Sequence, residues 1–165
     1  MRFAYADPPY PGMAYRYPEN EEVDHAALIA RLSEYDGWAL STGSVQLQEV
    51  IALCPKGVRV AAWVKSYVCM RPNVNPFYAW EPVIFTKRNL GKTREPIRDW
   101  IEHQPHPGWV LGRKPPAFCY WVLNLLGYQP GDTLDDIYPG SGIMGRVVAS
   151  REAQLVLTPE PVEET

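Results

Sequence analysis

The feature that most constrains this chain is a pair of short polar segments, one near each end, that each leave an apolar run. Asp7-Pro8-Pro9-Tyr10 follows the run 2–6, and Asp136-Ile137-Tyr138-Pro139-Gly140-Ser141-Gly142 leaves the run 133–137. Short apolar runs bounded by turn residues are typical of buried strands. Parallel strands of α/β proteins end at the crevice in which ligands bind. The two segments therefore predict an α/β fold with one site built from both ends of the chain.

The residue types in each segment indicate what such a site can bind. Proline fixes φ and has no N–H group to donate, so Pro8 and Pro9 hold the backbone open after the strand. The Asp7 carboxylate and the Pro8 carbonyl then point outward as a pair of acceptors for a donor group. In the second segment, Gly140 and Gly142 allow a tight turn along which a ligand can approach the backbone closely. A helix is expected directly after this turn.

These motifs resemble those of a known family. The chain contains Asp-Pro-Pro-Tyr and a later Asp-x-x-x-Gly-Ser-Gly, with Lys114-Pro115 and Pro130-Gly131-Asp132 between them. This set resembles the motifs of the amino-methyltransferases that act on adenine or cytosine amino groups in DNA. The catalytic segment comes first, as in the circularly permuted branch of that family and in eukaryotic adenine-RNA methyltransferases. The resemblance implies a Rossmann-like methyltransferase fold, a mostly parallel, twisted α/β sheet of about six strands with helices on both faces.

The resemblance also implies S-adenosylmethionine as the cofactor and roles for individual residues. Asp7 and Pro8 would accept the protons of the amino group, Pro9 would shape the pocket, and Tyr10 would stack on a flipped or unpaired base. Asp136 would lie near the cofactor's amino group, and Glu160 is the nearest candidate for its ribose hydroxyls. The cofactor would be bound by Lys114, Phe118, Asp136, Tyr138, Pro139, Gly140, Ser141, Gly142 and Glu160.

Contacts with nucleic acid are expected from three loops. The segment 87–114 contains seven positive and three negative side chains together with Trp100 and Trp109. Basic residues interleaved with aromatic ones suit phosphate contact and base stacking. A solvated loop whose tryptophans anchor it to the core explains the same pattern, and both interpretations stay open. The candidate contact residues are Tyr15, Arg16, Arg71, Asn73, Arg88, Lys92 and Arg94.

The chain departs from the family in its small recognition region. Only residues 88–113 stand where relatives carry a substantial target-recognition region. Target recognition is therefore expected to be of low sequence specificity, or to come from a homodimer or a specificity partner. Compact methyltransferases of phage and prophage genomes are similar in this respect, which favours a phage-type enzyme.

Length and apolar content are consistent with one domain. The 165 residues are 46% apolar, enough for a sizeable core. We expect a catalytic half over 1–87, a loop over 88–113, a cofactor-binding half over 114–160 and an acidic tail over 161–165. Between the motifs, the pattern predicts helices over 24–34 and 116–126, one ending near 53, strands over 38–40, 58–65, 80–87 and 153–157, and a helical turn near 97–102. Glu81, in the third of these strands, is expected to be structural rather than catalytic.

Composition restricts the compartment and the partners. Cys54, Cys69 and Cys119 are odd in number and lack metal-like spacing, so buried free thiols in a reducing compartment are expected. No secretory signal and no run of about 18 apolar residues is present, which favours the cytoplasm. His103 and His106 have no cysteine cluster nearby, so no metal site is expected. The net charge of −3 requires a local patch for any binding to nucleic acid.

The sequence thus predicts methyl transfer from S-adenosylmethionine to the exocyclic amino group of adenine in DNA, with no membrane partner. Cytosine amino methylation and RNA adenine methylation stay open, because the acceptor pair recognises an amino group and not a whole base. A non-catalytic subunit with a methyltransferase fold is an alternative of a different class. The intact motif 7–10 argues against that alternative, since a subunit without turnover does not need a polar acceptor in a crevice.

Overall fold

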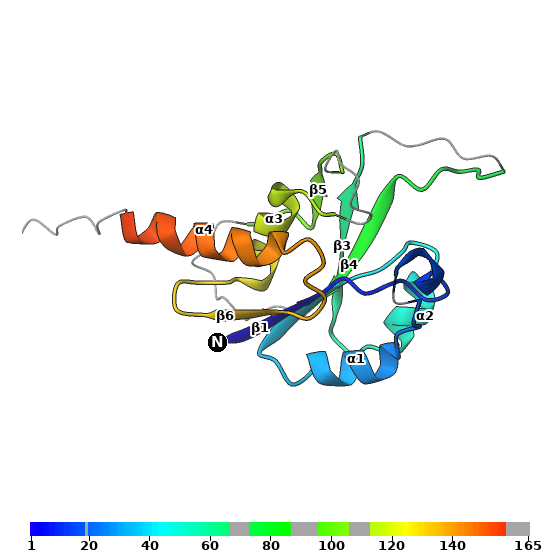
Figure 1. Ribbon diagram of the computed structural model, residues 1–165, viewed down its shortest axis with the longest axis horizontal. Helices are drawn as coiled ribbons and strands as arrows, with labels where there is room; N and C mark the ends of the chain where they lie inside the picture. Colours follow the sequence, from blue (N-terminus) through cyan, green and yellow to red (C-terminus); the bar gives the residue numbers. More distant parts are fainter. Residues whose placement is uncertain (19, 67–72, 87–95, 106–112, 158–165) are drawn as a thin grey trace, which may run out of the picture.

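The structure, a computed structural model, is a six-stranded sheet between two layers of helices (Figure 1). It describes residues 1–18, 20–66, 73–86, 96–105 and 113–157. The strands are β1 (Arg2–Ala6), β2 (Gly37–Ser41), β3 (Arg59–Val64), β4 (Trp80–Phe85), β5 (Trp100–Glu102) and β6 (Thr133–Asp136). The helices are η1 (Ala14–Arg16), α1 (His25–Leu32), α2 (Leu47–Ala52), α3 (Pro116–Leu126) and α4 (Ile143–Leu157).

The strand order is β5-β3-β4-β2-β1-β6. β1 is parallel to both of its neighbours, β2 and β6, and β3 is parallel to β5. β4 runs antiparallel to β2 and β3. Three of the five pairings are therefore parallel, which confirms the mostly parallel α/β sheet expected from the sequence.

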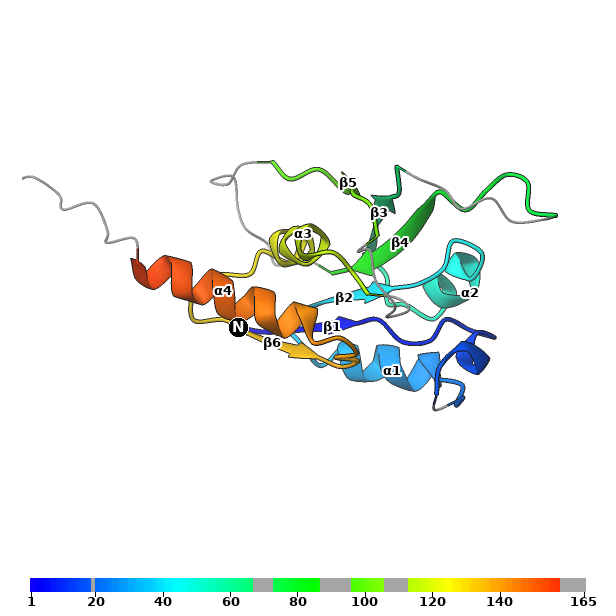
Figure 2. The same cartoon turned by 45° about the horizontal axis from the view of Figure 1, so that its top comes forward.

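Alternation along the strands divides the core between the two faces of the sheet. Phe3 and Tyr5 of β1 pack with α3 and α4, whereas Ala4 and Ala6 pack with α1 and α2. Figure 2 shows the α3–α4 pair on one side of the sheet and α1 on the other. Because a strand buried on both faces is apolar throughout, the continuous apolar run 3–6 identified β1 correctly.

Capping residues determine where two helices begin and end. The Asp24 carboxylate accepts a hydrogen bond of 2.9 Å from the Ala27 N–H and caps the start of α1. Gly127 ends α3 with φ +73°, a left-handed conformation that glycine adopts without strain. The cap at Asp24 and the end of α3 at Gly127 both confirm predictions from the sequence.

Two sequence predictions for local structure are wrong. Residues 153–157 belong to α4 and not to a strand, because no glycine or proline interrupts the helix between Gly145 and Leu157. The helical turn predicted near 97–102 is instead β5, which pairs with the open edge of β3. There the Ala62 N–H donates to the Asp99 carbonyl at 2.9 Å, and the His103 N–H donates to the Val64 carbonyl at 3.0 Å. β5 therefore takes the place of the strand predicted over 153–157, and the sheet still has six strands.

None of the helices in the described ranges is long and apolar enough to cross a membrane. Within the same ranges, no group of three or more His, Cys, Asp or Glu side chains is placed to hold a metal ion.

Candidate functional site

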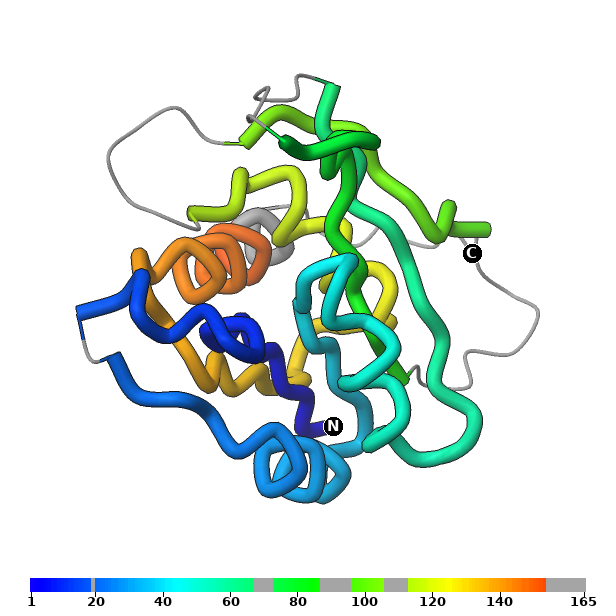
Figure 3. The backbone as a smooth tube through the Cα atoms, turned by 90° about the vertical axis from the view of Figure 1, so that its right-hand side faces the viewer, coloured from blue at the N-terminus to red at the C-terminus, as the bar shows by residue number. Residues whose placement is uncertain are grey.

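The two sequence motifs lie side by side at the carboxyl ends of two adjacent strands of the sheet. β1 and β6 are adjacent and parallel, with Tyr5 opposite Asp136, and the Ile137 N–H continues the pairing by donating to the Tyr5 carbonyl at 2.9 Å. Figure 3 views the sheet from this end, where the loop after β1 lies between the loop before α4 and the segment after β2. Asp7 and Asp136 therefore leave neighbouring strands at the carboxyl end of the sheet, as the sequence predicts.

Asp7 is held by a buried lysine. Lys114, just before α3, donates from Nζ to Asp7 Oδ1 at 2.9 Å, and its side chain is 6% exposed against 19% for Asp7. Within the described residues, Asp7 Oδ2 accepts no hydrogen bond. One carboxylate oxygen is thus engaged by a cation, while the other remains for an incoming donor.

Glu81, on β4, joins this pair to Tyr10. Its Oε2 accepts from the Tyr10 hydroxyl at 2.9 Å and from Lys114 Nζ at 3.4 Å, and its Oε1 accepts from Lys65 Nζ. Trp63 is opposite Glu81 across the antiparallel β3–β4 pair, so Lys65, two residues further, lies diagonally from Glu81 on the same face. The carboxylates of Asp7 and Glu81 and the ammonium groups of Lys65 and Lys114 form one charge-balanced cluster, called here the acid–lysine cluster.

The cluster controls which groups are charged. Burial raises the pKa of Asp7, and Lys114 offsets part of that rise. Burial alone would raise the pKa of Glu81, but Lys114 and Lys65 together outweigh it and lower the value to about 2. Burial likewise opposes the charge of Lys114, yet attraction to Asp7 and Glu81 raises its pKa well above the usual value. Lys114 is therefore a permanent cation that stabilises the ionised form of Asp7.

The other residues of the first motif differ in burial. Pro8 is buried, whereas Pro9 and Tyr10 are partly exposed. Burial raises the pKa of Tyr10 well above its usual value, and the charges of Glu81 and Asp7 add to this, so the hydroxyl stays a donor. A Cβ at Gly43, just after β2, would lie 3.1 Å from the Tyr10 ring. Tyr10 is therefore held by Glu81 at its hydroxyl, with the backbone of Gly43 close to its ring.

The second motif forms the turn before α4. Gly140 and Gly142 have φ of +45° and +68°, and the Gly142 N–H donates to the Pro139 carbonyl at 2.6 Å. Both glycines occupy left-handed conformations that few other residues adopt readily. Gly140 is exposed, so the backbone of the turn is accessible. Ser141 is partly exposed in the same turn, and Tyr138 packs against the core beside α1.

Asp136 has an unsatisfied acceptor. Its Oδ1 is buried, with no hydrogen-bond partner in the part of the chain that the structure describes. Burial, and to a smaller extent the Asp7 charge, raise the pKa of Asp136 to about 6. A buried carboxylate oxygen left without a donor is costly, and a ligand that carries an ammonium group would satisfy it. The residues present thus fit the amino-acid end of a cofactor such as S-adenosylmethionine.

Other predicted site residues lie elsewhere. Lys114 belongs to the acid–lysine cluster, where it donates to Asp7 and Glu81. Phe118 is fully buried among Tyr5, Trp63 and Trp121, and this position offers no surface to a cofactor. Tyr15 and Arg16 are exposed on η1, with the Arg16 guanidinium 5.7 Å from the Tyr15 ring centroid. Four of the predicted nucleic-acid contacts and one cofactor contact lie outside the described residues: Arg71, Arg88, Lys92, Arg94 and Glu160.

Sequence reasoning did not single out Lys65, and it gave Glu81 a structural role without identifying its partners. Both are charged residues next to or within apolar strand runs, where a charge needs a partner. That signal marks them as unusual, but it does not say which residues they meet. The partner of each is set by the register of β3 against β4 and by the placement of the chain before α3, which are long-range features.

The two described cysteines are free thiols, Cys119 buried and Cys54 half-buried. Burial raises the pKa of Cys54 to about 11, and burial followed by the Asp136 charge raises that of Cys119 to about 12. Neither is a thiolate at neutral pH, so neither is an activated nucleophile. Cys69 lies outside the described residues.

No protein-family model matches the chain, and no curated protein matches it. Among solved structures, the crystal structure of the M1.HpyAVI–SAM complex matches with a TM-score of 0.64 at 17% sequence identity, over 91% of this chain and 78% of that one. A crystal structure of M1.HpyAVI matches with a TM-score of 0.60 at 14% identity, over 92% and 76% of the two chains. The chain thus has the Rossmann-like methyltransferase fold of these structures.

Proposed function

We propose that this chain is a methyltransferase that moves the methyl group of S-adenosylmethionine to the exocyclic amino group of adenine in DNA. The observation that carries the proposal is the juxtaposition of two carboxylates at the carboxyl ends of adjacent strands. Asp7 has one oxygen held by Lys114, and its other oxygen has no partner among the described residues; it stands beside Asp136, whose Oδ1 likewise has none there, and its glycine turn. An acceptor for an amino group thus adjoins a place for a cationic cofactor. The fold match to a protein solved with SAM supports the same assignment.

On the cofactor side, Asp136 would hold the amino group, and the turn 139–142 would lie along the ligand. Bound S-adenosylmethionine supplies a methyl group on a sulfonium centre. Asp136 acts only as a binding group in this scheme. The orphaned oxygen requires a donor whether or not the chemistry proceeds.

On the substrate side, Asp7 and the Pro8 carbonyl would activate the amino group. The amino nitrogen of adenine is a poor nucleophile because its lone pair is delocalised into the ring. Two acceptors that bind both amino protons favour a pyramidal nitrogen and expose the lone pair, and they stabilise the positive charge that develops on nitrogen during transfer. Asp7 and Pro8 would hold the amino protons during the attack. The bond from the methyl group to sulfur breaks as its bond to nitrogen forms, a neutral thioether leaves, and the methylated nitrogen gives up one proton to solvent. No covalent intermediate with the protein is needed.

Tyr10 would hold the base by stacking, which requires a base that is flipped out or unpaired. We predict that Tyr10→Ala lowers kcat/KM for methyl transfer by about 5- to 150-fold, the equivalent of one stacking contact of roughly 1–3 kcal/mol. Cofactor affinity, measured by calorimetry, should change little. Tyr10→Phe is the matched control, since it keeps the ring and loses only the hydrogen bond to Glu81. Equal loss of turnover and cofactor affinity in Tyr10→Ala would place the ring against the cofactor instead.

Cofactor binding should depend on pH through Asp136. Because the pKa of Asp136 is raised to about 6, this group is protonated below that pH and cannot attract an ammonium group. We predict that S-adenosylmethionine affinity rises as the pH increases through 6 and becomes constant above 7. Asp136→Asn should weaken binding at pH 8 and remove the dependence, as titration calorimetry between pH 5 and 8 would show. A wild-type affinity that is flat over this range would exclude Asp136 as the partner of the amino group.

The proposal is tested by transfer of labelled methyl from S-adenosylmethionine to unmethylated double-stranded DNA, single-stranded DNA and RNA, followed by nucleoside analysis. Label in N6-methyladenine from DNA is the expected result. Label in methylcytosine, or in RNA alone, would keep the chemistry and change the substrate. Binding of the cofactor without label on any polymer would identify a non-catalytic or partner-dependent subunit.

A further inference from the structure

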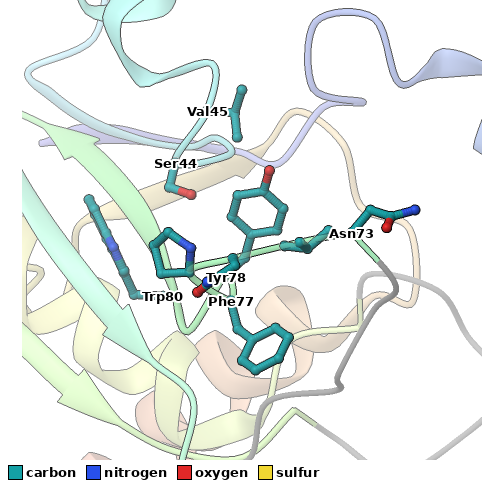
Figure 4. A pocket seen from close by; sticks show the side chains of 9 residues that line it. Ser44, Val45, Asn73, Phe77, Tyr78 and Trp80 are labelled. Atoms are coloured by element: carbon teal, nitrogen blue, oxygen red, sulfur yellow. The ribbon is translucent and has the colours of Figure 1, made fainter.

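A shallow pocket of about 400 Å³ lies beside the site and belongs to neither motif. We call it the aromatic pocket; Ser44, Val45, Asn73, Phe77, Tyr78 and Trp80 are among the residues that line it (Figure 4). Three of its rings are exposed, Phe77 by 41%, Tyr78 by 53% and Trp80 by 37%. Within the described residues, the ring–ring contacts lie in the core and none involves these three side chains. Their faces are thus available to a ligand.

The aromatic pocket is continuous with the place of Tyr10. β2 and β4 are antiparallel, with Ser41 opposite Val83, and the Thr42 N–H donates to the Pro82 carbonyl at 3.1 Å. Ser44 follows Thr42 by two residues and Trp80 precedes Pro82 by two, and both line the pocket. A chain neighbour of each contacts Tyr10: the backbone of Gly43, before Ser44, lies close to the Tyr10 ring, and Glu81, after Trp80, accepts from the Tyr10 hydroxyl. Two lining residues of the pocket are therefore each next in the chain to a residue that contacts Tyr10.

The lining suits a nucleobase better than an aliphatic or charged ligand. A nucleobase has two π faces and an edge of donors and acceptors. The described lining offers exposed rings for the faces, and amides and hydroxyls from Asn73, Ser44 and Tyr78 for the edge. None of the described lining residues is charged, so neither an ion pair nor repulsion of the phosphate backbone arises there. Figure 4 shows the Tyr78 ring directed toward Val45 and the Phe77 ring directed the opposite way.

We propose that the aromatic pocket binds a second, unstacked nucleobase, the neighbour of the target adenine on the same DNA strand. The inference rests on the proposed function, which places the target base on Tyr10. It follows that the enzyme favours a strand that is locally unpaired at two successive positions. Single-stranded DNA should therefore be a better substrate than duplex DNA of the same sequence.

The test uses a single-stranded thymidine oligonucleotide that contains one adenine with 2-aminopurine beside it. Stacking against a protein ring quenches 2-aminopurine fluorescence. The full-length protein should quench it, and Tyr78→Ala should weaken binding by about 5- to 150-fold, as expected for one stacked base. Tyr78→Phe, which keeps the ring and loses only the hydroxyl, should retain most of the binding. Leu53→Ala is the control, because Leu53 is an apolar residue at the end of α2 that is 45% exposed and does not line the pocket.

Methyl transfer to the same oligonucleotide, measured in parallel, separates the two proposals. Wild-type methylation with quenching and affinity unchanged in Tyr78→Ala would overturn the pocket and leave the function standing. Quenching that depends on Tyr78 without methylation would support the pocket and overturn the function. Loss of self-association in Tyr78→Ala, with DNA binding unchanged, would assign the surface to a second copy of the chain and overturn the inference.

Discussion

Asp7→Asn should lower the rate of methyl transfer by about two to three orders of magnitude, the usual effect of removing one preorganised group that stabilises developing charge. The asparagine keeps the shape and one acceptor oxygen but loses the negative charge that faces the nitrogen. The expected change is in the chemical step, so single-turnover transfer with saturating DNA and cofactor is the measurement. S-adenosylmethionine affinity should stay within about twofold, because Asp7 touches the substrate side only.

Asp135→Asn is the matched control for Asp7→Asn. Asp135 lies on β6 beside β1, its side chain is 51% exposed, and it pairs with the Tyr35 hydroxyl and Arg2. It resembles Asp7 in residue type but not in burial or placement, and its replacement should leave transfer unchanged. If Asp7→Asn keeps a transfer rate within about tenfold of the wild type, the Asp7 carboxylate is not part of the mechanism. A group that stabilises developing charge contributes more than about tenfold to the rate.

Much of the fold is encoded locally and could be predicted. The ends of β1 and β6, the cap at Asp24 and the end of α3 at Gly127 depend on residues next to them in the chain. The strand predicted over 153–157 was wrong because short apolar runs fit a helix and a strand equally well, and the helix already begun at Ile143 continues through them. β5 was missed because its pairing comes from the open edge of β3 and not from its own three residues.

The site could be predicted only in part, for a related reason. Motifs at strand ends placed Asp7 and Asp136 correctly, because topology alone brings those ends together. The acid–lysine cluster joins β3, β4, the loop after β1 and the chain before α3, and its contacts depend on strand register and side-chain reach. No local pattern states that Lys114 meets Asp7. Sequence resemblance alone therefore placed Lys114 with the cofactor.

Lys114→Met is the variant that tests this reassignment, and we expect it to shift the acid side of the pH–rate profile. Burial already raises the pKa of Asp7, and Lys114 is the main group that opposes the rise. Without the ammonium group, the pKa of Asp7 should increase further, while transfer still requires the ionised form. The rate at saturating cofactor should therefore reach its plateau at higher pH than in the wild type. Lys114→Arg, which keeps the charge, should restore much of the profile.

The stability of Lys114→Met should change with pH in a related way. Removing one partner of a buried ion pair costs on the order of 3–5 kcal/mol of unfolding free energy, because a charge is left without compensation. In the variant, the folded-state pKa of Asp7 lies above its unfolded value, so the folded state binds the proton more tightly. Stability should then be highest below the unfolded pKa and fall as the pH rises through the raised value. Denaturant unfolding across this range measures it, with the exposed Lys56→Met as the control.

The pattern of outcomes decides what Lys114 does. A shifted profile together with unchanged S-adenosylmethionine affinity identifies a positioning residue that keeps Asp7 ionised. Lower stability with an unshifted profile would make Lys114 purely structural, since packing alone does not alter the protonation of Asp7. Weaker cofactor binding with an unshifted profile would return Lys114 to the cofactor side. Because the lysine ammonium lies 2.9 Å from Asp7 Oδ1 and is almost fully buried, we expect the first outcome.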